Sequence, residues 1–167
     1  MRQRLRSRAK AAAGFTLIEL VITLALVGVV AMTALPLYDV SATRSKEAEL
    51  RTALRTIRTA IDAYKTAADS GLVAKGSVES GYPPSLDVLV NGVDAAKETI
   101  NGGRRMVFLR QIPRDPFAAD QATPPAQHWV TRAYGAPPDD FRGGGDVFDV
   151  ASRSSRVGTN GVPYQEW

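Results

Sequence analysis

Residues 12–24 read A-A-G-F-T-L-I-E-L-V-I-T-L, and Glu19 is the only charged residue in the apolar run from Phe15 to Tyr38. A carboxylate inside such a run costs about 2.5–3.5 kcal/mol on membrane-insertion scales, so it is normally retained for a reason. How the N-terminal part of the chain is interpreted therefore depends on the role of Glu19.

The charge of the chain is concentrated in a basic leader, residues 1–14, which contains no acid. Its five cations are Arg2, Arg4, Arg6, Arg8 and Lys10. The formal net charge is +4, so the rest of the chain is close to neutral. The excess of base is therefore no sign of nucleic-acid binding, and no nucleic-acid partner is expected. The chain has no cysteine, which excludes disulfides and a thiol nucleophile.

The apolar run at residues 15–38 is long enough to be a transmembrane helix. A helix rises about 1.5 Å per residue, so the run spans roughly 36 Å, and the hydrocarbon core of a bilayer is about 30 Å thick. Positive-inside bias keeps the basic leader in the cytoplasm. The part of the chain after Tyr38 is therefore expected on the outer side of the membrane.

Three interpretations of this run compete. In a secretory signal peptide the apolar region has about 7–15 residues and precedes a small-residue cleavage site. This run is longer and contains only weak sites, such as residues 29–31. A plain membrane anchor fits the length but leaves Glu19 unexplained. If the chain is instead cut after Gly14, the new amine of Phe15 lies about one helical turn from Glu19, and the two charges could neutralise each other between neighbouring subunits.

The order of residues 14–20, G-F-T-L-I-E-L, resembles the class III signal peptide of type IV pilins and type II secretion pseudopilins. The resemblance implies that a prepilin peptidase cleaves after Gly14 and N-methylates Phe15. It also implies an assembly salt bridge between Glu19 and the Phe15 amine of an adjacent subunit. Pro36 matches a proline common near the end of this helix in the family, and a helix kink is expected there. The alternative is that Pro36 simply ends the membrane segment.

Residues 39–70 are expected to continue the helix in amphipathic form. Apolar residues recur at spacings of three and four and form one stripe along the helix. They are Leu50, Leu54, Ile57, Ile61, Tyr64 and Ala68. The charged residues of this segment, Glu47 and Arg58 among them, are expected on the opposite, solvated face. Gly71 is a suitable left-handed cap for the end of the helix.

Residues 71–167 are expected to form a periplasmic globular domain. Segments 128–134 and 146–151, and a shorter one near 162–167, are rich in β-branched and aromatic residues and predict short antiparallel strands. The expected fold class is α+β and type IV pilin-like. It has a long N-terminal helix, half transmembrane and half amphipathic, packed on a small antiparallel sheet of about three strands.

The resemblance extends to the major pseudopilins of type II secretion systems (protein G) at residues 109–117, 145–152 and 160–167, among others. It implies a structural subunit of a periplasmic pseudopilus that drives protein export. The subunit would be anchored by one span in the bacterial inner membrane, with its C-terminal domain in the periplasm. Implied partners are other copies of the chain, minor pseudopilins, the prepilin peptidase, and an inner-membrane assembly platform with its ATPase.

The alternative function is that of a type IV pilin or minor pilin in adhesion, motility or DNA uptake. Such pilins usually close their C-terminal region with a disulfide, so the absence of cysteine counts against this alternative. No enzyme is expected. His128 is the single histidine, and no serine has the neighbours of a catalytic triad.

Resemblance to protein G implies a calcium ion in the C-terminal loop. The candidate oxygen donors are Asp146, Asp149, Ser152 and Asn160. Residues 150–165, however, contain no acid and include Arg153 and Arg156, whose charges repel a cation. Calcium therefore competes with a second possibility, in which hydrogen bonds together with Tyr164 and Trp167 hold the loop.

Overall fold

The computed structural model describes residues 14–73, 79–96 and 105–167, without the side chains at positions 33–37. The predicted leader thus lies outside the described residues, apart from Gly14. The chain divides into two compact units, Met1–Ser41 and Ala42–Trp167.

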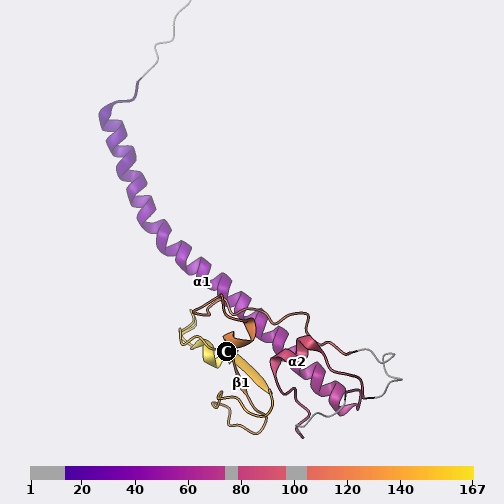
Figure 1. Cartoon of the computed structure of the whole chain (residues 1–167). Coiled ribbons are helices and arrows are strands. Elements are labelled where there is room, and N and C mark those ends of the chain that lie inside the picture. Colours follow the sequence, from indigo (N-terminus) through magenta and orange to yellow (C-terminus); the bar gives the residue numbers. More distant parts are fainter. Residues whose placement is uncertain (1–13, 74–78, 97–104) are drawn as a thin grey trace, which may run out of the picture. The chain divides into compact units, whose positions relative to one another are not determined.

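One long helix, α1 (Leu17–Asp69), begins three residues after Gly14 (Figure 1). The hydroxyl of Thr16 accepts a hydrogen bond from the backbone N–H of Glu19 at 3.3 Å, which satisfies one free donor of the first turn. The prediction that the apolar run and residues 39–70 form one helix is confirmed. The helix continues through position 36, and the kink expected at Pro36 stays a prediction.

The helix ends where its glycine cap was predicted. Gly71 has a φ of 67°, in the left-handed region, and its N–H donates to the carbonyl of Ala68 at 3.1 Å. The N–H of Leu72 donates to the carbonyl of Ala67 at 2.9 Å. These two bonds satisfy carbonyls that the last turn of α1 leaves free.

The core of the second unit is built on the apolar stripe of α1. All six stripe residues from Leu50 to Ala68 are buried, which confirms the face predicted from their spacing. The helix α2 (Leu86–Asn91) packs on the same core. Other buried members are Leu86, Leu89, Trp129, Val150 and Tyr164.

A two-stranded antiparallel sheet joins β1 (Trp129–Arg132) to β2 (Asp149–Ser152). The register pairs the first residue of β1 with the last of β2, and the last of β1 with the first of β2. The 3₁₀ helix η2 (Pro125–His128) precedes β1, and η3 (Tyr164–Glu166) follows β2 along the chain. The α+β fold class, with a long helix packed on a small sheet, is confirmed.

The prediction of about three strands is wrong for the described part of the chain, in which two strands form the sheet. Residues 162–167, expected as the third strand, contain η3 and one isolated bridge between Val157 and Pro163. Pro163 has no amide hydrogen to give to a ladder, and its φ of −58° suits the start of the helical turn that follows. The other two strands are shorter than predicted, since His128 lies in η2 and Asp146 lies outside β2.

Candidate functional site

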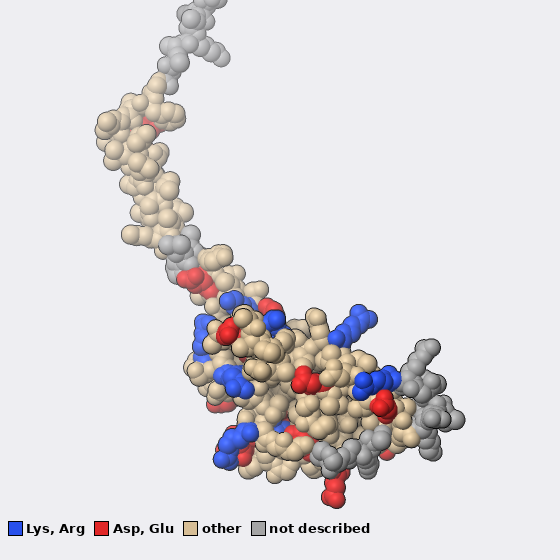
Figure 2. All heavy atoms as spheres, viewed as in Figure 1, with Lys and Arg blue, Asp and Glu red and all other residues tan. Residues whose placement is uncertain are grey.

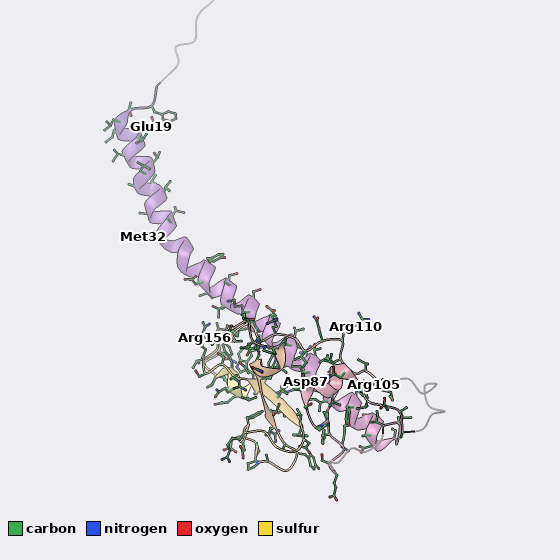
Figure 3. All side chains as sticks on the ribbon, in the orientation of Figure 1. Glu19, Met32, Asp87, Arg105, Arg110 and Arg156 are labelled. Carbon is green, nitrogen blue, oxygen red and sulfur yellow. The ribbon has the colours of Figure 1, made fainter. Side chains whose placement is uncertain are left out.

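The predicted cleavage site lies in an accessible stretch just before α1. Gly14 and Phe15 have no regular secondary structure, and the Phe15 side chain is 84% exposed. Glu19 lies in the first turn of the helix and is also exposed (Figure 3). The structure therefore places Gly14, Phe15 and Glu19 within a few residues of one another at one end of a helix.

The helix that follows exposes apolar side chains on all its faces. From Leu17 to Met32 every side chain is exposed, and Glu19 is the only charged one. In Figure 2 this segment is drawn almost entirely in the colour of uncharged residues. So much exposed apolar surface on a helix calls for apolar surroundings in the functional state. Among the described residues, no helix is sufficiently long and apolar to span a bilayer.

The predicted calcium donors are each bonded to other protein groups. Asp149 accepts hydrogen bonds from Arg58 at 2.7 Å and from Arg132 at 3.3 Å. Asp146 accepts one from the backbone N–H of Tyr134 at 2.9 Å. Its second oxygen accepts from the hydroxyl of Ser80.

The other two candidate donors are also engaged. The hydroxyl of Ser152 donates to Asp115 at 2.5 Å, and the side-chain oxygen of Asn160 accepts from the N–H of Val162 at 3.1 Å. In the part of the chain that the structure describes, no three His, Cys, Asp or Glu side chains converge on one point. Each of the four residues is therefore engaged by protein groups, and a calcium ion, which takes six to eight oxygens, stays a prediction at this place.

The C-terminal segment (residues 157–167) is held instead by Glu47 of α1. One carboxylate oxygen accepts from the backbone N–H of Thr159 at 2.6 Å and from the hydroxyl of Tyr164 at 3.2 Å. The other accepts from the hydroxyl of Thr159 at 2.6 Å. The prediction that Glu47 lies on the solvated face is wrong, because only 2% of the residue is exposed. The sequence did contain a signal for the burial of Glu47, since this residue precedes Leu50 by three positions and extends the buried stripe.

Hydrogen bonding keeps Glu47 ionised inside the fold. Burial by itself raises the pKa of this carboxyl, but the hydrogen bonds from Thr159 and Tyr164 and the charge of Arg51 outweigh it, so the pKa lies below the ordinary value of 4.5. Burial, together with the bond to Glu47, raises the pKa of Tyr164 and keeps its hydroxyl a donor. The pair is therefore arranged to hold the C-terminal segment at neutral pH.

Acidification should weaken this attachment. The pKa of Glu47 is lower in the folded than in the unfolded state. Its contribution to the free energy of unfolding is therefore complete at pH values above 4.5 and is lost as pH falls through the folded-state pKa. We expect the free energy of unfolding to fall in this range, and to fall less in the variant Glu47→Gln. Denaturant titrations of the detergent-solubilised chain between about pH 3 and pH 7 measure both. Identical pH profiles for the two proteins would contradict the assignment.

Aromatic residues complete the packing of the C-terminal segment. Tyr164 stacks on Phe117 with ring centroids 4.1 Å apart and meets the ring of Trp167 edge-on at 5.0 Å. The guanidinium of Arg51 lies 4.3 Å from the centroid of the Trp167 ring. The indole N–H of Trp167 donates to the carbonyl of Val162 at 3.3 Å. These contacts connect the segment to α1 and to the core.

This packing leaves no room for a side chain at Gly158. A Cβ atom there would lie 2.6 Å from the ring of Trp167 and 2.8 Å from the side-chain oxygen of Asn160. We expect Gly158→Ala to lower the free energy of unfolding by about 1–3 kcal/mol, as overpacking does in other cores. Gly161→Ala does not test overpacking, since no atom lies within 4 Å of its Cβ position, and any loss of stability there would come from its φ of 80°. Gly145→Ala, with open space and no such φ, is the control that should leave stability unchanged in thermal melts.

His128, Asp115 and Ser152 are all buried and bonded in a way that supports structure. One nitrogen of His128 accepts from the backbone N–H of Asp115 at 3.3 Å, and the other lies 2.9 Å from the hydroxyl of Thr123. Ser152 donates to the carboxylate of Asp115, whereas a hydrolytic serine is bonded to the histidine that takes its proton. The network fixes the segment before β1 against the end of β2.

Comparison with known proteins gives one finding, and it concerns the N-terminal region of the chain. Residues 9–35 match the prokaryotic N-terminal methylation motif. The match includes Gly14, Phe15 and Glu19, and it supports a protein of the type IV pilin-like class, with a prepilin signal and an N-methylated first residue. It implies processing by a prepilin peptidase and assembly into filaments, and it suggests anchoring through the N-terminal helix. Comparison with curated proteins and with solved structures gives no match.

Proposed function

We propose that this chain is a structural subunit of a periplasmic pseudopilus that drives protein export through a type II secretion system. One observation carries the proposal: a single carboxylate, Glu19, lies in the first turn of a helix whose described side chains up to Met32 are otherwise uncharged and exposed. Such a helix is stable only when other helices or lipid cover it. The matched methylation motif supports the more general part of this proposal, a type IV pilin-like subunit that assembles into filaments.

In the proposed mechanism the prepilin peptidase cuts after Gly14 and methylates the amine of Phe15. The mature subunit waits in the inner membrane, held by the apolar part of α1. During assembly the helices of neighbouring subunits bury one another, and Glu19 pairs with the methylated amine of the next subunit. A charge buried without a partner costs several kcal/mol, so this pairing selects subunits in the correct register.

The second unit has a mechanical and not a catalytic role in this proposal. It provides lateral contacts between subunits, and its C-terminal segment is attached to α1 through Glu47. An assembly platform with its ATPase would supply the work of extraction, and minor pseudopilins would begin the filament. Growth of the filament would then move folded proteins towards an outer-membrane channel.

Processing is the first test. We expect the mature protein to begin at N-methyl-Phe15 and Gly14→Val to prevent the cut. No atom lies within 4 Å of a Cβ at Gly14, so this variant should prevent recognition of the site by the peptidase without disturbing the fold of the chain. Gly28→Val, which also meets open space, is the matched control and should be cleaved normally. Intact-mass spectrometry separates the products, and an uncut chain or one that begins after Ala31 would contradict the assignment.

Deletion of the chain tests the export role. We expect the deletion strain to retain its type II substrates inside the cell envelope, while its surface fibres and twitching motility are unchanged. Quantitative proteomics of the culture medium and electron microscopy measure the two phenotypes. Loss of fibres with normal export would instead identify a type IV pilin or minor pilin.

A further inference from the structure

The side chain of Arg58, on α1, connects three parts of the second unit that are far apart in the sequence. Its Nε donates to the carboxylate of Asp149 at 2.7 Å. Its Nη2 donates to the carbonyl of Val150 at 3.0 Å and to a main-chain oxygen of Trp167 at 2.8 Å. One cation on the helix thus binds three oxygens, two at the start of β2 and one at the end of the C-terminal segment.

This arrangement has the bonding pattern of a cation site, with a guanidinium as the cation. Asp149 also accepts from Arg132 at 3.3 Å, so two positive charges face one carboxylate. A divalent metal ion at this position would meet two guanidinium groups and oxygens that are already bonded. The same residue, Asp149, was one of the donors expected to bind calcium.

We propose that Arg58 acts as an internal cation that holds the C-terminal segment against α1, so that the folded second unit is independent of calcium. Three directed hydrogen bonds from a planar guanidinium fix the positions of its acceptors, as a metal fixes its ligands. The proposal rests on these contacts alone and applies equally to a pilin or a pseudopilin.

Limited proteolysis of the full chain in detergent tests the proposal without any variant. Arg153 and Arg156 are exposed trypsin sites beside the C-terminal segment (Figure 3 labels Arg156). Fragments that end at these two residues report how often the segment opens. We expect the same rate of their formation in millimolar calcium and in excess chelator. A chelator-induced increase that calcium reverses would overturn the proposal.

Replacement of Arg58 by methionine tests the role of the guanidinium itself. We expect Arg58→Met to form the fragments that end at Arg153 and Arg156 about tenfold faster than the wild type, because charge-assisted hydrogen bonds are lost. Arg55→Met, on an exposed position of the same helix, removes one trypsin site and one charge in the same way and should keep the wild-type rate.

A second variant covers the case in which Arg58→Met fails to fold. Asp149→Asn removes the carboxylate charge but keeps an oxygen that can accept the Nε bond. We expect it to form the same fragments faster than the wild type, by a smaller factor than Arg58→Met and again without response to calcium. Equal rates for wild type and both variants, or protection of either variant by calcium beyond the wild-type rate, would overturn the proposal.

Discussion

Glu19→Ala is expected to give a protein that is cleaved and methylated normally but does not polymerise. Without the carboxylate, the protonated amine of Phe15 in the neighbouring subunit enters an apolar helix bundle unpaired. Such a buried charge costs several kcal/mol at each subunit contact, which corresponds to a loss of polymer of about 100-fold or more. Shearing and sedimentation of filaments after overexpression, with immunoblots of both fractions, measure the loss.

The position of Glu19 allows this test to separate an effect on assembly from an effect on the fold of the subunit. Its side chain is exposed, and its hydrogen bond to the hydroxyl of Thr16 is made by the backbone N–H and not by the carboxylate, so the substitution should leave the folded subunit intact. Glu19→Asp keeps the charge on a shorter side chain and should restore part of the polymer. Thr23→Ala, one turn later, is the neutral control and should polymerise normally. Wild-type filament yield from Glu19→Ala would remove the basis of the proposed function.

Glu47→Ala is expected to lower the free energy of unfolding by about 2–4 kcal/mol. The substitution removes the acceptor of three hydrogen bonds and leaves the N–H of Thr159 and the hydroxyl of Tyr164 without their partner in the interior. The C-terminal segment should then detach from α1 more readily. Denaturant unfolding of the full chain in detergent, followed by the fluorescence of Trp167 and Trp129, measures the change.

Two neighbouring variants show whether the effect belongs to the carboxylate. Glu49→Ala removes an exposed acid from the same helix and should change stability by no more than about 0.5 kcal/mol. Glu47→Gln keeps the size of the side chain, but its amide group offers one acceptor oxygen where the carboxylate offers two, and most of the loss should remain. If Glu47→Ala and Glu49→Ala were equally stable, the assigned role of Glu47 would be wrong.

The helical part of the structure was predicted well because its signals are local. The stripe from Leu50 to Ala68 follows the helical period, so its burial could be read from spacing alone. The end of the helix at Asp69 follows from the conformational freedom of Gly71 two residues later. Contacts within four residues decide both features.

The sheet was predicted less accurately because strands depend on distant partners. Residues 162–167 contain Val162, Tyr164 and Trp167, a composition that also suits a strand. The structure instead turns Tyr164 into the core, where it meets Phe117 and Glu47. No local pattern specifies that turn. Tyr164 can pack in the core only after α1 and the segment before β1 have come together and provide its partners.

The sequence by itself determined the candidate site at Gly14, Phe15 and Glu19. Both signals are local in sequence: a short cleavage motif, and one charged residue in an otherwise apolar helix. The same is true of the apolar stripe and its glycine cap. Only the tertiary structure decided how the C-terminal segment is held, by Glu47 across 112 residues and by Arg58 across 109. Both side chains belong to a charged helical segment, and although Glu47 extends the spacing of the apolar stripe, no local pattern shows which distant groups Glu47 or Arg58 binds. Burial of Glu47 and partial burial of Arg58 became favourable only when folding brought donors and acceptors from the opposite end of the chain to satisfy their charges.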